Sequence, residues 1–324
     1  MHYVITGAGQ IGAQLAEDLV REGHRVTVIR RGERAPAEGA ELLRGDAGDP
    51  EILTRAVRGD TACGEPAAAI FHCIHTAYDV KAWRRDLPHR EAAVMDVAAG
   101  AGIPVVFPES VYAFGKGAEE LIEGARIAPC SPLGRVRAEL LTARAAHPAR
   151  TLSVVAADLL GPTASAATSV FLQLVLNPSS RGKTAWVMGD PDAPRSVTYI
   201  PDLTRAMITA AQHADELAQD GDAVLLAPST PPLTQRAMAA SAASAAHRGE
   251  AKVRRLPWAL FSAVGPFNAQ FRELGRQRYL WDAPAVMTPG VLTDRFGLRS
   301  TPWEEVLSSS ATLAAQPEGS GIRS

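Results

Sequence analysis

Short apolar runs alternate with helical patterns along the first 160 residues of the chain. The apolar runs predict strands at residues 2–6, 25–30, 41–43, 68–73, 103–107 and 152–157. Between the first two runs, Ile11, Leu15 and Leu19 recur at helical spacing, and Gly23 follows them as a stop signal. Strands and helices that alternate at this spacing predict an α/β fold with a doubly wound parallel sheet.

The pattern changes after Gly161-Pro162. We expect a helix near 170–176, strand and turn over 186–197, a helix from about 201 to 211, a strand at 223–227 and a helix at 237–247. These segments predict a first domain over residues 1–160, to which residues 197–215 return. A smaller C-terminal region over 161–307 would shape a substrate pocket, and residues 308–324 would form a flexible tail.

The 324-residue chain is 46% hydrophobic and nearly balanced in charge, with 33 basic and 35 acidic side chains. This balance argues against a nucleic-acid partner, which normally requires a strong basic excess. The three cysteines form no C-x-x-C pair, so we expect no disulfide framework and no metal site, and a cytoplasmic location. We also expect no membrane association, because no apolar run reaches the roughly 20 residues of a membrane span and no signal peptide is evident.

One glycine-rich string carries the first functional signal. Gly7-Ala8-Gly9-Gln10-Ile11-Gly12 directly follows a predicted strand and opens a predicted helix. This G-x-G-x-x-G spacing is typical of the Rossmann dinucleotide turn: Gly7 permits the tight turn, Gly9 admits a pyrophosphate and Gly12 lets helix and strand pack closely. The free N–H groups at the helix start would stabilise the phosphates. We therefore expect a nicotinamide dinucleotide here, with Gln10 and Ile11 among its contacts.

The end of the second predicted strand indicates which dinucleotide binds. An NAD site normally places a carboxylate there to accept hydrogen bonds from the ribose 2′-OH. Here the strand runs into Arg30-Arg31, and guanidinium groups suit a 2′-phosphate through charge-assisted contacts. The sequence therefore predicts NADP(H) in preference to NAD(H). A solvated arginine pair is the alternative.

Later strand ends would complete the cofactor site, because ligands of such sheets lie at the carboxyl ends of the strands. After the third strand, Asp46 would accept a hydrogen bond from the adenine amino group. After the fourth strand, the backbone would pass beneath the cofactor ribose. The further expected contacts are Ala47, Cys73, Ile74, His75, Ala157 and Asp158.

Four other segments stand out: IFHCIH at 70–75, VFPESVYAFG at 106–115, VAADLLGP at 155–162 and RSVTYIPD at 195–202. They resemble, in order, the patterns hFHLAA, hhFSSSxxVYG, RPxNhYGP and RDFhYVxD of the extended short-chain dehydrogenase/reductases, specifically the NAD-dependent epimerase/dehydratase group. The resemblance covers nearly the whole chain. It implies a Rossmann fold and a nicotinamide cofactor.

In that family a Ser or Thr, a Tyr and a Lys four residues later carry catalysis, and the Lys lowers the pKa of the Tyr. Ser110 falls on the family serine, but Leu133 and Arg137 occupy the Tyr and Lys positions. Leucine cannot carry a proton, and arginine keeps its charge at any useful pH. Tyr112 and Tyr78 are therefore the candidates to supply a hydroxyl, and Arg137 to supply positive charge. For both tyrosines, packing in a wall is the alternative.

The expected substrate-binding residues are Trp83, Arg195, Tyr199 and Trp281. The resemblance implies that Arg195 contacts phosphate, as in family members with sugar-nucleotide substrates, so this residue points to an anionic substrate. A surface ion pair is the alternative for Arg195. The apolar stretch 257–271 favours a hydrophobic substrate instead.

These observations together predict an NADPH-dependent oxidoreductase that acts on a small carbonyl or enone substrate. Two alternatives remain open: an epimerase or dehydratase with tightly bound NAD(P), and a non-catalytic NADP(H)-binding regulator. The missing Tyr/Lys pair adds weight to the regulator, which stays behind the oxidoreductase. The resemblance also implies a homodimer, formed through the helices at 89–101 and 133–146.

Overall fold

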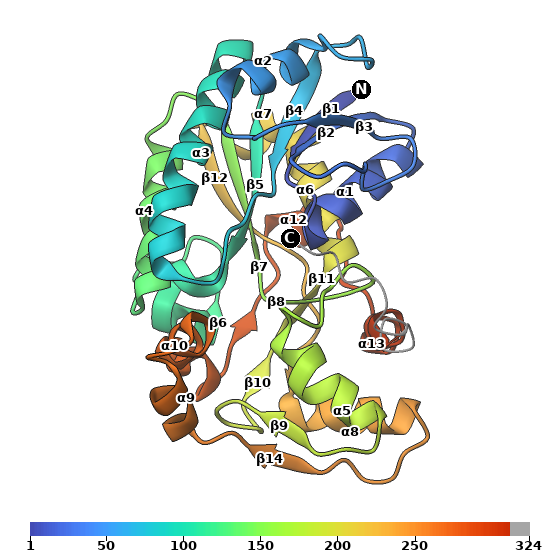
Figure 1. Cartoon of the computed structure of the whole chain (residues 1–324), viewed down its shortest axis with the longest axis vertical. Coiled ribbons are helices and arrows are strands. Elements are labelled where there is room, and N and C mark those ends of the chain that lie inside the picture. The colour runs from blue at the N-terminus through green and yellow to red at the C-terminus, as the bar shows by residue number, and fades with distance from the viewer. Residues whose placement is uncertain (312–324) are drawn as a thin grey trace.

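A seven-stranded parallel sheet forms the centre of the protein, in the order β12-β7-β5-β4-β1-β2-β3 (Figure 1). The computed structural model describes residues 1–311 of the chain. The strands are β1 (His2–Thr6), β2 (Arg25–Arg30), β3 (Glu41–Arg44), β4 (Ala67–His72), β5 (Val105–Ser110), β7 (Thr151–Ala156) and β12 (Asp222–Leu226). The strand order reverses at β1, which lies between β2 and β4, so a ligand crevice is expected beyond the carboxyl ends of β1 and β4. The predicted α/β fold with a doubly wound parallel Rossmann sheet is confirmed.

Helices cover both faces of this sheet. The helices α1 (Gln10–Arg21) and α6 (Ile200–Gln212) pack together on one face, where Thr204 of α6 donates a hydrogen bond of 2.5 Å to Asp18 of α1. The helices α2 (Pro50–Arg58), α3 (Val80–Ala101) and α4 (Pro132–Ala145) cover the other face (Figure 1). Large apolar side chains of the strands, such as Ile5 and Phe71, are fully buried between these layers.

Local signals in the sequence set where these helices begin. The Asp49 carboxylate accepts a hydrogen bond of 2.9 Å from the Glu51 N–H at the start of α2, and Pro50 is the first helical residue. Ser131 caps α4 in the same way and accepts 3.0 Å from the Gly134 N–H. Both caps follow the pattern that the sequence predicts.

The C-terminal region, joined by residues 111–121 and 158–160 from the first part of the chain, lies beyond the carboxyl ends of the sheet and has its own apolar core (Figure 1). Its short strands are β6 (Glu120–Leu121), β8 (Asp158–Leu160), β9 (Ala185–Val187), β10 (Pro194–Arg195), β11 (Val197–Tyr199), β13 (Leu233–Thr234), β14 (Val253–Arg255) and β15 (Val286–Met287). Its helical segments are η1 (Val111–Glu119), η2 (Phe171–Leu176), α5 (Asn177–Ser180), α8 (Gln235–Ala245), α9 (Trp258–Val264), α10 (Ala269–Arg276), α11 (Arg278–Trp281) and α13 (Trp303–Ala311). The short helices α7 (Ala214–Leu217) and α12 (Val291–Asp294) pack with the core of the first domain.

Two expectations about the organisation of the chain were wrong. The strand near 223–227 was placed in the C-terminal region, but β12 is an edge strand of the central sheet, parallel to β7 and in register from Asp222 opposite Thr151. The tail was expected from 308, but α13 continues to Ala311 because Val306 and Leu307 bury their side chains. The rest of the expected tail, residues 312–324, lies outside the described residues. Within residues 1–311, no helix is long and apolar enough to cross a membrane.

Candidate functional site

The glycine turn leaves open space at the switch point of the sheet. Gly7 has a φ of +86°, which side-chain-bearing residues rarely adopt. At Gly12 an added Cβ would lie 2.1 Å from the carbonyl oxygen of Gly7, so only glycine lets α1 approach the turn. At Gly9, by contrast, an added Cβ would meet nothing within 4 Å. The turn is therefore tight where it packs and empty where the pyrophosphate of a dinucleotide would approach.

One cavity extends from this turn along the ends of β2 and β3. The residues that line it are Gly7, Ala8, Gly9, Ile29, Arg30, Arg31, Gly32, Gly45, Asp46, Ala47, Cys73, Ile74, His75 and Arg90. The structure thus brings the expected residues Arg30, Arg31, Asp46 and Ala47 to one place. Within residues 1–311, no carboxylate pairs with either guanidinium of the Arg30-Arg31 pair. Both remain available to an anionic group, as a 2′-phosphate requires.

Sequence reasoning missed Arg90, which α3 brings into this cavity. Its Nη2 lies 3.8 Å from Asp46 Oδ2, and its Nε is buried without a hydrogen-bond partner. Asp46 also accepts a hydrogen bond of 2.9 Å from the Gly48 N–H. An orphaned donor beside the Arg30-Arg31 pair adds positive charge on the side where the adenosine half of a dinucleotide would lie. Nothing in the helical pattern of α3 distinguishes this arginine from a solvent-exposed one.

A second cavity, of about 890 Å³ including the space open to solvent, continues from Gly9 toward the ends of β4, β5 and β7. The lining residues that were expected here are Gln10, Ile11, Cys73, Ile74, His75, Ser110, Arg137 and Ala157. Burial lowers the pKa of His75 from 6.5 to about 4, and Arg137 adds to this effect. Burial likewise raises the pKa of the Cys73 thiol, so this cysteine stays a neutral thiol. The imidazole of His75 is therefore neutral at physiological pH.

Buried charges form the wall of this second cavity. Arg144 of α4 is 1% exposed and donates to Glu91 through two hydrogen bonds of 2.8 and 2.7 Å. Its third nitrogen, Nη1, donates hydrogen bonds of 2.9 Å to both Glu109 and Ser153. The other Glu109 oxygen lies 3.4 Å from Arg137 Nε. Two guanidiniums and two carboxylates thus neutralise one another out of water, which is the condition under which buried charges are tolerated.

This network explains what stands at the Tyr and Lys positions of the family motif. Leu133 is fully buried and packs with Trp83, Leu87 and Leu140. The Arg137 guanidinium lies 4.6 Å above the centre of the Trp83 ring, and its Nε lies 3.4 Å from Glu109 Oε1. Arg137 thus supplies a fixed positive charge to the second cavity and cannot move a proton.

The two candidate tyrosines are hydrogen-bonded to each other through their hydroxyl groups. The hydroxyl oxygens of Tyr78 and Tyr112 are 3.0 Å apart, and the Tyr112 ring stacks on Trp83. Burial raises the pKa of Tyr112, and burial together with its neighbour Tyr112 raises the pKa of Tyr78 well above 10. Both phenols are therefore protonated at neutral pH, and within the pair one hydroxyl donates to the other.

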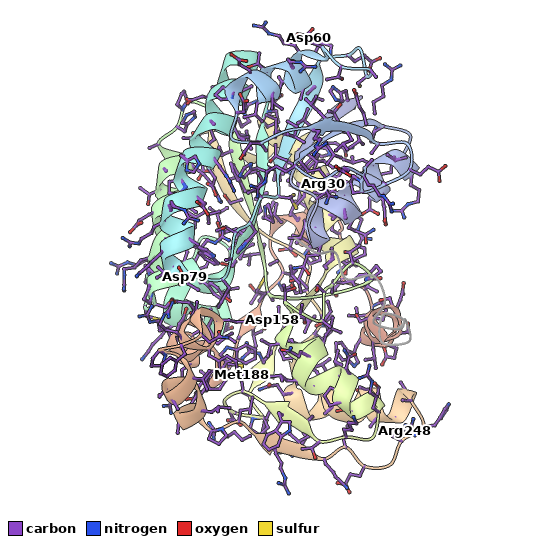
Figure 2. All side chains as sticks on the ribbon, viewed as in Figure 1. Arg30, Asp60, Asp79, Asp158, Met188 and Arg248 are labelled. Carbon is purple, nitrogen blue, oxygen red and sulfur yellow. The ribbon has the colours of Figure 1, made fainter. Side chains whose placement is uncertain are left out.

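A third cavity opens beside the second, between the sheet and the C-terminal region. It shares Ser110, Ala156 and Ala157 with the second cavity and encloses about 560 Å³ including the space open to solvent. Its wall also includes Tyr112, Asp158 and Arg195. Figure 2 shows Asp158 where the sheet meets the C-terminal region, so this expected cofactor contact faces the third cavity instead. The remaining lining residues are Val111, Ala118, Ser196, Leu280, Trp281, Ala285 and Met287.

Two expected substrate contacts, Trp83 and Tyr199, do not line this cavity, and a third, Arg195, lines it as one half of an ion pair. Trp83 is 1% exposed and lies in the core under Arg137, so it does not line this cavity. Tyr199 is 9% exposed and packs in the core of the C-terminal region. Arg195 does line the cavity, but its charge is already paired, because its Nη2 donates 3.1 Å to Asp158 Oδ2. Trp281, the fourth expected residue, lies in the wall of the third cavity as expected.

Known proteins resemble the chain in sequence pattern and in fold. A model of the NAD-dependent epimerase/dehydratase family matches residues 3–225, whereas no curated protein sequence matches. UDP-glucose 4-epimerase from Brucella ovis in complex with NAD is similar in structure, with a TM-score of 0.70, 16% identity and coverage of 97% of this chain and 98% of that chain. So is the Bordetella bronchiseptica enzyme WbmH in complex with NAD⁺, with a TM-score of 0.66, 18% identity and coverage of 96% and 97%. UDP-N-acetylglucosamine 4-epimerase from Bacillus cereus has a TM-score of 0.70, 11% identity and coverage of 98% and 100%.

Proposed function

The chain belongs to the NAD-dependent epimerase/dehydratase family, and on that premise we propose that it is a hydride-transfer enzyme that uses NADP(H). The observation that carries the proposal is the continuity of the three cavities. A crevice that is open at Gly9 leads past Ser110 and Arg137 into a cavity lined by hydroxyl groups. A cofactor and a small substrate would therefore meet at Ser110.

The residues of the first two cavities fit the cofactor. Gly9 leaves the space that a pyrophosphate needs, and the buried unpartnered Nε of Arg90 is a donor without an acceptor. Arg30 and Arg31 would hold the 2′-phosphate of NADP(H), whereas the similar solved structures contain NAD. When bound, such a cofactor supplies or accepts hydride. The protein contributes position and charge: Arg137, fixed by Glu109, would keep positive charge beside the cofactor ribose.

The substrate oxygen would receive its hydrogen bonds from Ser110 and Tyr112. Both residues line the third cavity, and the phenol of Tyr112 stays protonated and is oriented by Tyr78. Two donors aimed at one oxygen stabilise the negative charge that develops on it during hydride transfer. This arrangement would replace the Tyr/Lys pair of the family motif. It would be slower than the usual pair, because neither phenol is primed to accept a proton.

The family membership favours a reaction in which the cofactor stays bound and is restored in each turnover, as in an epimerase or dehydratase. A net reduction of a small carbonyl or enone substrate by NADPH is the second candidate. The observation that favours the second candidate is the apolar part of the third cavity's wall, formed by Leu280, Trp281 and Met287, which suits an uncharged carbonyl or enone compound.

The test begins with a fluorescence titration of the full chain with NADPH, NADH, NADP⁺ and NAD⁺. We expect NADPH and NADP⁺ to bind at least tenfold more tightly than their counterparts. Nucleotide released from heat-denatured protein would favour the retained-cofactor reaction, and steady consumption of NADPH with ketones would favour reduction. In either case Tyr112→Phe should lower turnover without changing cofactor affinity. Binding without any turnover would favour a regulator, and binding of none of the four cofactors at millimolar concentration would refute the proposal.

A further inference from the structure

The third cavity contains two charged side chains, and they are paired with each other. Arg195 Nη2 donates 3.1 Å to Asp158 Oδ2, and Arg195 Nη1 donates 2.5 Å to the Leu280 carbonyl. The guanidinium also lies 4.4 Å above the centre of the Trp281 ring. The side chain of Arg195 is 3% exposed, whereas that of Asp158 is 35% exposed. The carboxylate is thus the more exposed of the two charged groups, and on the guanidinium only the buried Nε is left without a hydrogen-bond partner.

The charges of the two side chains cancel, so the lining of the cavity carries no net positive charge. A phosphate group that approached Arg195 would also approach the Asp158 carboxylate, and like charges at short range in a partly buried site repel strongly. Displacing Asp158 would leave a buried guanidinium and a carboxylate without their partners, which is costly. The rest of the wall, including Leu280, Trp281 and Met287, is largely apolar. Such a surface suits an uncharged ligand.

We propose that Asp158 excludes phosphate-bearing substrates from this cavity, and that the substrate is an uncharged, largely apolar compound with a hydroxyl or carbonyl group. The inference rests on the proposed function, because it concerns the substrate of the same site. Ser110 and Tyr112 would hydrogen-bond the reacting oxygen. Asp158 Oδ1, which accepts no hydrogen bond within residues 1–311, could accept one from a second hydroxyl of the ligand. The proposal separates this chain from the similar proteins that are named as epimerases of UDP-sugars.

The test compares two ligands that differ by one phosphate group, 1-naphthol and 1-naphthyl phosphate, by calorimetry on the full chain saturated with NADP⁺. We expect wild-type protein to bind 1-naphthol at least tenfold more tightly, and UDP-glucose to give no heat at millimolar concentration. In Asp158→Asn, the amide oxygen still accepts from Arg195 but the negative charge is gone. We therefore expect the preference for 1-naphthol over its phosphate to fall at least tenfold in this variant, and UDP-glucose to raise its Tm.

Asp192→Asn is the matched control. Asp192 forms two hydrogen bonds of 2.8 and 2.9 Å with Arg236 on the surface, away from the cavity. This variant should retain the wild-type preference. Wild-type protein that binds 1-naphthyl phosphate or UDP-glucose as tightly as 1-naphthol, or that binds none of the three, would overturn the inference without any variant. Because NADP⁺ binding is measured in the same preparation, failure of the proposed function would show as loss of cofactor binding and is distinguishable.

Discussion

Replacing Glu109 by glutamine should destabilise the protein far more than an ordinary loss of one ion pair. Glu109 is fully buried and accepts 2.7 Å from the Ser110 N–H and 2.9 Å from Arg144, with Arg137 Nε at 3.4 Å. Glutamine offers one acceptor and one donor, so one end of its amide must point an N–H group at another donor. The site would also carry one uncompensated positive charge. Breaking a buried pair in this way costs about 3–5 kcal/mol of unfolding free energy.

The measurement is urea unfolding followed by circular dichroism, with Glu139→Gln as the control. Glu139 also pairs with an arginine, Arg84 at 3.1 Å, but its side chain is 60% exposed. The control should lose only about 0–1 kcal/mol, as surface pairs do. If Glu109→Gln unfolds within 1 kcal/mol of Glu139→Gln, the network does not hold the wall of the second cavity, and the account of Arg137 as a fixed charge fails with it.

Three further changes test the cofactor crevice and its surroundings. Arg30→Asp should shift the NADPH/NADH affinity ratio by at least tenfold toward NADH in a fluorescence titration, and an unchanged ratio would show that Arg30 does not recognise the 2′-phosphate. Gly9→Val should leave the Tm unchanged and abolish cofactor binding, because the new side chain points into open space; retained binding would place the cofactor elsewhere. Burial lowers the pKa of His72 from 6.5 to about 3, so its contribution to stability is complete above pH 6.5 and is lost as the pH falls from there toward 3. Between pH 6 and 4.5, the wild type should therefore lose about 1 kcal/mol per pH unit more than His72→Gln in urea unfolding, and parallel curves would contradict this.

The sequence predicts the parts of this protein that depend on local spacing. The strand ends at Thr6 and Arg30, the glycine turn and the capped starts of α2 and α4 all follow from residues that lie close together in the chain. Such signals need no knowledge of the tertiary structure, because a turn or a cap is satisfied by its own neighbours. The candidate cofactor crevice therefore rests on the most local signals in the sequence.

The substrate end could not be located in this way, because its residues are separated by long stretches of chain. Trp83 and Tyr199 were expected in a pocket wall, but an aromatic residue suits a core equally well and only packing decides. Arg144 joins carboxylates that lie 53 and 35 residues away in sequence. The sequence around a buried arginine on a helix does not differ from the sequence around an exposed one, so Arg144 could not be identified in advance. The place of the edge strand β12 could not be predicted for the same reason, because its neighbour β7 lies about 70 residues earlier in the chain.

The two departures from the family motif, at positions 133 and 137, are physically connected to their neighbours, which argues against a simple loss of function. Arginine at position 137 cannot give up its proton, so its burial requires a carboxylate, and Glu109 supplies it at 3.4 Å. Glu109 in turn needs Arg144 and Glu91 to leave the four charges balanced. Leucine at 133 removes the usual phenol and packs beside Trp83, on which Tyr112 stacks in contact with Tyr78. A decaying active site would leave some of these groups unpaired. Here the four buried charges balance and Tyr112 lines the third cavity, which is the arrangement expected if a different set of groups now performs the chemistry.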